Sequence, residues 1–185
     1  MAWTFFNIQM AFRSPPGDPL RQAVRDLVVQ SGRRHTPNQH RAMYRRLNEL
    51  VQRAMPQLQR WAWDLVRTDA ARDDYQEWNT DLEDTSDVPD LQANAATPFE
   101  QHAVITVILL APRDSPADKG LGELCDIEES QWMRRATCSR LLAGLETLDF
   151  ASVHGDGIYL QPGPRGHGPL ATDLDEGWDW LGEVE

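Results

Sequence analysis

Hydrophobic positions along the chain fall into short runs that predict three β-strands. Residues 3–12 are dense in aromatic and β-favouring side chains, and residues 103–111 form a continuous apolar, β-branched run. A run of that kind is covered on both faces, so we expect the strand at 103–111 to be central in its sheet. The third strand is expected within residues 150–161, where Gly155-Asp156-Gly157 predicts either a bulge or a short hairpin.

Hydrophobic residues spaced by three and four positions predict helices between these strands. A first helix runs from Pro19 to about Gly32, and its buried stripe is Leu20, Ala23, Val24, Leu27 and Val28. Thr36 followed by Pro37 predicts the start of a second helix, because the threonine hydroxyl can cap it and proline is tolerated at its first position. The stripe of that helix is Met43, Leu47, Leu50, Val51 and Ala54. At Pro56 the helix either kinks or ends where a new one starts. Beyond it, helical spacing continues through Leu58, Trp61 and Leu65 toward Tyr75 and Trp78.

The rest of the chain predicts two more helices and several loops. Residues 130–148 form a helix with Trp132 on its buried side, and residues 173–181 form one or two turns. We expect a polar loop at 112–122, a mobile acidic loop at 81–98 and a Gly/Pro-rich loop at 162–172. No internal repeat is visible in the sequence.

Together these elements predict one α+β domain spanning residues 1–185. Its sheet has about three strands packed against helices, in the order strand, helix, helix, strand, helix, strand, short helix. If the strands at 103–111 and 150–161 are neighbours, the helix between them predicts a parallel, right-handed crossover.

Charge is distributed unevenly along the chain. The sequence has 29 acidic and 18 basic residues and a formal net charge of -11. Residues 1–67 carry a net charge of +7 and residues 68–185 a net charge of -18, by count of their ionisable side chains. Either the two parts attract each other within one fold, or the Arg-rich helices of residues 21–67 present a basic face to an external anion or nucleic acid. That face would consist of Arg33, Arg34, Arg41, Arg45, Arg46, Arg53 and Arg60.

Residues that could carry chemistry are sparse. The two cysteines, Cys125 and Cys138, lack CxxC spacing, and Cys138 lies inside the predicted helix at 130–148, where we expect it to be buried by packing. We therefore expect no disulfide, metal site or cofactor and a cytoplasmic location, and we assign no catalytic residue. An uncharacterised enzyme remains an alternative that would require His102, His154 or Asp156 to converge in a pocket.

Tryptophans supply the main functional signal, because interface centres are enriched in them. The expected interface residues are Trp3, Phe5, Trp61, Trp63, Trp178 and Trp180. They favour a non-enzymatic, cytoplasmic protein–protein interaction or scaffold module that binds another protein or itself, with nucleic acid and membrane not expected as partners. The strand at 3–12 is apolar on both faces and needs cover, so we predict a homo-oligomer in which Phe5→Glu yields a monomer.

Hydrophobic motifs in the C-terminal part resemble the domain-of-unknown-function 1517 family of bacteria and plastids. The similar segments are the strand at 104–111, the helix residues 141–148 and the strand ending in Leu160-Gln161-Pro162. Ile8-Gln9-Met10-Ala11 also resembles a strand motif of that family. The resemblance covers about 80 residues well, and it implies an α+β fold with no catalytic residues to carry over.

Overall fold

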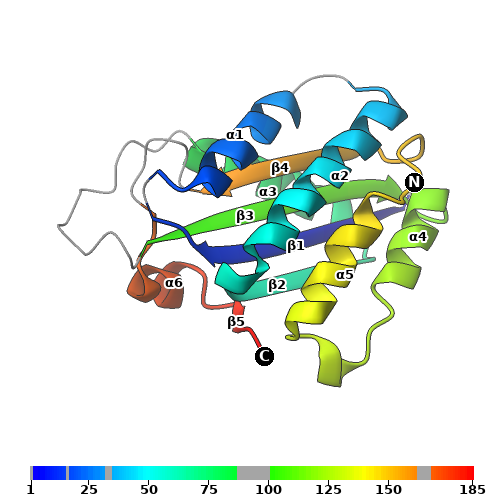
Figure 1. Ribbon diagram of the computed structural model, residues 1–185. Helices are drawn as coiled ribbons and strands as arrows, with labels where there is room; N and C mark the ends of the chain where they lie inside the picture. The colour runs from blue at the N-terminus through cyan, green and yellow to red at the C-terminus, as the bar shows by residue number, and fades with distance from the viewer. Residues whose placement is uncertain (1, 16, 32–34, 87–100, 162–167) are drawn as a thin grey trace.

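Five antiparallel strands form a single sheet in the computed structural model, which describes residues 2–15, 17–31, 35–86, 101–161 and 168–185. Their spatial order is β4-β3-β1-β2-β5 (Figure 1). The strands are β1 (Trp3–Arg13), β2 (Leu58–Val66), β3 (His102–Pro112), β4 (Gly155–Gln161) and β5 (Gly182–Glu183). The predicted α+β class is confirmed, but the prediction of about three strands is wrong, because β2 and β5 were missed.

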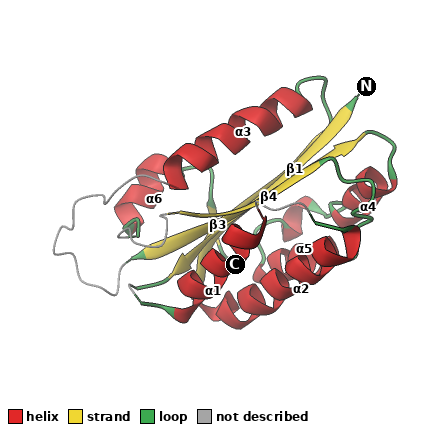
Figure 2. Ribbon diagram, turned by 90° about the horizontal axis from the view of Figure 1, so that it is seen from above, coloured by secondary structure: helices red, strands yellow, loops and turns green. Residues whose placement is uncertain are grey.

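The helices form two unequal layers on the faces of this sheet (Figure 2). One face is covered by α1 (Pro19–Ser31), α2 (Pro37–Ala54), α4 (Pro116–Leu124) and α5 (Arg135–Leu145). The opposite face is covered by α3 (Ala71–Ser86) and α6 (Ala171–Gly177). Short 3-10 turns at Met55–Gln57 and Glu129–Gln131 complete the regular structure of the described residues. Among those residues, no helix combines the length and hydrophobicity that crossing a membrane requires.

The fold contains two topologically equivalent halves. Each half is a strand, two helices and a second strand: β1-α1-α2-β2 and β3-α4-α5-β4. β1 and β3 pair antiparallel at the centre, where Ile8 lies opposite Val107, and each half's second strand flanks its own first strand. Because both helix pairs cover the same face, an approximate two-fold rotation normal to the sheet relates the halves (Figure 1). This duplication is not visible as a repeat in the sequence.

β1 is an interior strand that is covered on both faces by its own chain. Phe6, Ile8 and Met10 pack in the main core with the four helices, and each is 0% exposed. Trp3 and Phe5 point to the other face, where they pack in a cluster with α3. The prediction that residues 3–12 place apolar side chains on both faces of the strand is confirmed. We expected a second copy of the chain to cover Trp3 and Phe5, but α3 of the same chain covers them.

β2 was predicted as helix because Leu58, Trp61 and Leu65 also fit helical spacing. In the structure, Met55–Gln57 ends α2, and the following residues pair antiparallel with β1 from Leu58 to Val66. Trp61 is completely buried, whereas Asp64 is exposed on the opposite face. With β2 beside β1 and β5 beside β2, the sheet has three interior strands, whereas a three-stranded sheet has one.

Several other predicted boundaries are corrected by local signals. Residues 116–124 form α4 in place of a loop, because the Ser115 side chain caps the helix and Pro116 starts it. The helix predicted at 130–148 is divided into a 3-10 turn and α5, and Trp132 is 44% exposed. β4 begins at Gly155 with continuous antiparallel register to β3, so the structure shows no bulge, hairpin or parallel crossover there.

Other predictions hold in whole or in part. The first two helices are confirmed, including the Thr36 cap and Pro37 at the start of α2. α6 confirms the short helix near the C-terminus. α3 extends through residues 81–86 of the predicted acidic loop, while residues 87–98 lie outside the described residues. Of the predicted Gly/Pro-rich loop, residues 162–167 also lie outside them, and α6 begins at Ala171.

Candidate functional site

A belt of buried polar side chains divides the face of the sheet that carries α3 and α6. Asn7, Gln9, Thr106 and Gln161 lie on this face, each less than 9% exposed. On one side of the belt, an apolar cluster consists of Trp3, Phe5, Ala71, Leu82, Ile108, Leu110 and Tyr159. On the other side, a smaller cluster consists of Ala11, Val104, Leu174 and Leu181. Each helix therefore covers one cluster, and the polar belt lies between them.

α3 is fixed on the first cluster by aromatic contacts and one partly buried hydrogen bond. The Phe5 ring lies edge-on to the rings of Tyr75 and Trp78, with both pairs of centroids 6.0 Å apart. The Tyr159 hydroxyl donates a hydrogen bond to Oδ1 of Asn79 at 2.6 Å. These contacts hold Trp78 where α3 passes beside the polar belt.

α6 and the segment after it are fixed on the second cluster. Leu174 and Leu181 are buried, and Nη2 of Arg60 lies 2.5 Å from Oδ1 of Asp175. The chain then pairs with β2 through β5. Trp178 packs against the cluster, and the Trp180 indole N–H donates to Oε1 of Gln9 at 2.5 Å.

A cleft of about 360 Å³ lies between these two helical segments and reaches the sheet. Its lining consists of Gln9, Trp78, Asp81, Leu82, Gln161, Gly177, Trp178 and Trp180. The volume lies toward the lower end of the range of small-molecule sites, about 300–1,000 Å³. We call this site the tryptophan cleft.

Gln9 in the floor of the tryptophan cleft is held by two hydrogen bonds. Gln9 uses its oxygen to accept from Trp180 and its amide N–H to donate to Oγ1 of Thr106, at 3.2 Å. Asp81 on α3 is the one ionisable side chain among the described residues that line the cleft. The other lining side chains are aromatic, aliphatic or amide groups, a combination common in small-molecule binding sites.

The structure brings together two of the predicted interface residues, Trp178 and Trp180, in the tryptophan cleft. Trp3, Phe5 and Trp61 are instead buried inside the chain, and the Trp61 indole N–H donates to the Met133 carbonyl oxygen at 3.2 Å. A homo-oligomer stays a prediction, but Trp3, Phe5 and Trp61 are buried and do not form an interface between copies.

Trp63 lies on the opposite face of the sheet from the cleft, where its ring meets the ring of exposed Trp132 edge-on at 6.1 Å. Trp78 was not among the predicted interface residues. The sequence signal at Trp78 was its spacing of three residues from Tyr75 and four from Leu82, which indicated a helix but not a binding site.

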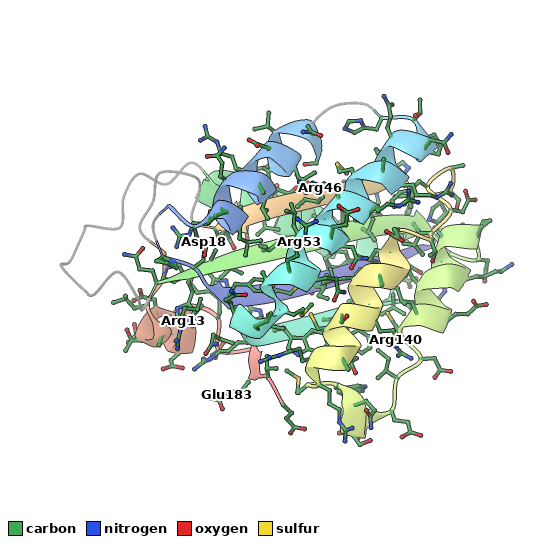
Figure 3. All side chains as sticks on the ribbon, viewed as in Figure 1. Arg13, Asp18, Arg46, Arg53, Arg140 and Glu183 are labelled. Carbon is green, nitrogen blue, oxygen red and sulfur yellow. The ribbon has the colours of Figure 1, made fainter. Side chains whose placement is uncertain are left out.

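The predicted basic residues that the structure describes lie on two elements, α2 and β2. Arg33 and Arg34 lie outside the described residues, and Arg41, Arg45, Arg46 and Arg53 belong to α2. Figure 3 shows Arg46 and Arg53 spread along that helix. Arg60 belongs to β2 and pairs with Asp175 on the α6 side of the sheet.

Two of the α2 arginines have carboxylates nearby. Arg45 lies 3.8 Å from Glu146, and Arg46 lies 3.1 Å from Glu49. Arg45–Glu146 and Arg60–Asp175 thus join the basic N-terminal part to the acidic C-terminal part, in agreement with the interpretation that these parts attract each other within the fold.

The groups considered for an enzyme are separated. The backbone N–H of His154 donates a hydrogen bond to the Leu110 carbonyl oxygen near one end of β3. His102 lies at the other end of β3, about 26 Å from Leu110 at the usual rise of a strand. Asp156 points to the four-helix face, where it accepts a hydrogen bond from the Tyr44 hydroxyl at 3.1 Å. Burial raises the pKa of Asp156, and His40, 3.9 Å away, opposes that shift.

Cysteine and metal chemistry also find no support in the described part of the chain. Burial raises the pKa of Cys125 to about 12 and raises the pKa of Cys138 as well, so both thiols stay protonated at neutral pH. No group of three histidine, cysteine or acidic side chains that could hold a metal ion occurs among the described residues.

Two other hollows of the described surface lie among helices and do not reach the sheet's polar belt. One, of about 530 Å³, lies between α1 and α2 and is lined by residues such as Asp26, His35 and Arg46. The other, of about 390 Å³, includes Arg13, Asp18 and Arg53 (Figure 3). Neither has the aromatic walls of the tryptophan cleft.

Comparison of the chain with known protein families, with curated proteins and with solved structures found no match.

Proposed function

We propose that this protein is a non-enzymatic binding module and that the tryptophan cleft is its binding site for a small organic molecule. The observation that carries the proposal is the convergence of Trp78, Trp178 and Trp180 on one cleft whose floor is made of buried glutamine side chains. Ligand sites in proteins commonly combine such aromatic walls with a few fixed polar groups.

The exposure of Trp180 supports this assignment. It is 53% exposed, although its indole N–H is held by Gln9 at the floor of the cleft. The hydrogen bond to Gln9 anchors this exposed ring in a defined orientation beside the cleft. A bound molecule would remove part of its surface from water at little cost in side-chain entropy.

A fragment library containing cationic, neutral and anionic compounds tests the proposal by ligand-observed NMR. We expect fragments that bind the wild-type protein and lose at least roughly tenfold in affinity in Trp180→Ala, through lost stacking. The matched control is Trp132→Ala, which removes a similarly exposed tryptophan far from the cleft and should leave binding unchanged.

The proposal is wrong if no fragment distinguishes Trp180→Ala from the wild type, provided that both proteins give the same circular dichroism spectrum and Tm. If Trp132→Ala loses binding and Trp180→Ala keeps it, the binding site lies at the Trp63–Trp132 pair and not at the cleft.

A further inference from the structure

The hollow of about 390 Å³ lies where the end of β1 meets the start of α1 and the end of α2. Its apolar floor consists of Leu20, Ala23, Leu50 and Ala54. These side chains lie at the margin of the main core, where Leu50 and Ala54 are buried and Leu20 and Ala23 are half-buried. The floor therefore offers apolar surface to a ligand, and the volume lies within the usual range of small-molecule sites.

Two arginines line this hollow from different elements. Arg13 ends β1, and Arg53 lies in the last turn of α2. In the described part of the chain, neither guanidinium forms an ion pair or a hydrogen bond. By contrast, Arg45, Arg46 and Arg60 each have a carboxylate nearby. We call this site the arginine hollow (Figure 3).

Asp18 is the one carboxylate among the described residues that line the arginine hollow, and it is engaged at the start of α1. Its Oδ1 accepts a hydrogen bond from the Leu20 backbone N–H at 2.7 Å. Burial lowers the pKa of Arg21 and the charge of Asp18 opposes that shift, so this carboxylate also attracts Arg21. With two arginines and one aspartate, the described lining carries a net charge of +1.

The electrostatic potential at this end of the sheet is positive, although the whole chain carries a net charge of -11. Burial lowers the pKa of His102, the Pro169 carbonyl opposes that shift, and the charges of Arg13, Arg60 and Arg21 lower the pKa further. Arginines from three elements therefore act on the same buried imidazole. A field of this sign attracts an anion to the arginine hollow.

The floor and the two arginines together select the chemical class of the ligand. A guanidinium matches the geometry of an oxyanion such as a carboxylate, and an apolar floor favours an apolar chain. One negative charge balances the net charge of the lining, whereas a phosphate monoester carries close to two at neutral pH. A nucleic acid would bring many negative charges to an acidic protein and is therefore disfavoured.

We infer that the arginine hollow binds a small organic monocarboxylate with an apolar chain. Arg13 and Arg53 would bind the carboxylate, and the chain would lie on Leu20, Ala23 and Leu50. The arginine hollow lies among helices of the four-helix face, so this inference goes beyond the function proposed for the tryptophan cleft and does not depend on it.

Nuclear magnetic resonance titration of the isotope-labelled full chain with hexanoate, hexanol and inorganic phosphate tests the inference. We expect hexanoate to shift the backbone amides that line the arginine hollow. It should bind roughly tenfold more tightly than hexanol at low salt and weaken as salt is added. Inorganic phosphate should bind more weakly than hexanoate, because it leaves the apolar floor uncovered.

Variants at the lining locate the binding. Arg13→Gln and Arg53→Gln should each weaken hexanoate roughly tenfold and leave hexanol unchanged, and both side chains are exposed, so the core stays intact. Arg140→Gln is the matched control, because it changes an exposed arginine on α5, away from the hollow, and should have no effect (Figure 3). Ala23→Leu fills part of the floor and should weaken both hexanoate and hexanol.

Several outcomes would overturn the inference. These are equal affinity for hexanoate and hexanol, hexanoate binding that neither Arg13→Gln nor Arg53→Gln weakens, and no shift of the lining amides at millimolar hexanoate. Inorganic phosphate that binds as tightly as hexanoate would show a simple anion site and would overturn the assigned ligand class. Trp180→Ala should leave hexanoate binding unchanged, so failure at the arginine hollow and failure at the tryptophan cleft are distinguishable.

Discussion

Asp118 is the carboxylate that ties the start of α4 to the central strands. It is 3% exposed and accepts hydrogen bonds from the Thr4 hydroxyl at 2.7 Å and the Asp114 backbone N–H at 2.8 Å. Nη2 of Arg67 lies 2.9 Å from its Oδ1. Burial acts to raise the pKa of Asp118, but these donors outweigh it and hold the pKa below the ordinary value of 3.8.

Asp118→Asn should lower the free energy of unfolding by about 2 kcal/mol at neutral pH, because bonds to a charged acceptor are replaced by weaker ones. The pKa of Asp118 is lower in the folded state than in the unfolded state. Its contribution is therefore complete above the unfolded value and is lost as pH falls through the folded value. Urea denaturation at pH 7 and pH 3 should show a difference between wild type and variant that shrinks in acid.

The control for this measurement is Asp126→Asn, which changes an exposed carboxylate and should leave stability within about 0.5 kcal/mol of wild type. A difference between wild type and Asp118→Asn that is independent of pH would show that the charge of Asp118 does not contribute.

At the scale of elements, the packing of α3 on β1 decides what Phe5 does. Phe5 is 1% exposed and lies between the sheet and the rings of Tyr75 and Trp78. The sequence alone predicted that Phe5→Glu would release a soluble monomer. The structure predicts that the same substitution places a carboxylate in an apolar cluster, where an unpaired charge is very unfavourable.

Phe5→Glu should therefore lower the free energy of unfolding by at least about 3 kcal/mol, the lower end of losses seen when buried phenylalanine is truncated. Thermal denaturation followed by circular dichroism measures this loss. Val29→Glu on α1, at a position 58% exposed, is the control and should keep the wild-type Tm. A Phe5→Glu protein with a wild-type Tm and a reduced mass would restore the interface interpretation of Phe5.

At the scale of the whole molecule, the two β-α-α-β halves are joined through the β1–β3 pair. β1 and β3 pair along their full length, from Trp3 opposite Pro112 to Arg13 opposite His102. Each half alone would expose one of these strands as a long, apolar edge. Neither half is therefore expected to be stable alone.

Residues 1–86 and residues 101–185, produced together as separate chains, should copurify in a 1:1 ratio with the far-ultraviolet circular dichroism of the intact protein. Each segment produced alone should aggregate, because β1 or β3 lacks its partner. Light scattering of the separate segments checks this prediction, and a folded, monomeric half would contradict it.

The sequence predicted those elements whose signal is local. These signals depend on neighbouring residues, and each is present in the structure: the Thr36 cap with Pro37 after it, the helical stripes of α1 and α2, and the alternation in β1. β2 was missed because Leu58, Trp61 and Leu65 satisfy both a helical stripe and a strand. Only pairing with β1 decides between those alternatives.

The candidate site was only partly visible in the sequence. Trp178 and Trp180 were recognised as surplus tryptophans, but Trp78 lies about a hundred residues away and was assigned to a helical stripe. Gln9 appeared as one polar residue within an apolar strand. Their convergence depends on α3 and α6 covering the same face of the sheet, which no local pattern encodes (Figure 2).

The sequence by itself determined the α+β class, the first two helices, the buried strands and the unequal distribution of charge, because short-range spacing and composition control these properties. Tertiary structure alone decided the five-strand order, the duplication of two halves and the separation of α3 from α6 by a polar belt. The physical reason is that strand pairing and helix placement join residues far apart in the chain, and many pairings satisfy the same hydrophobic pattern.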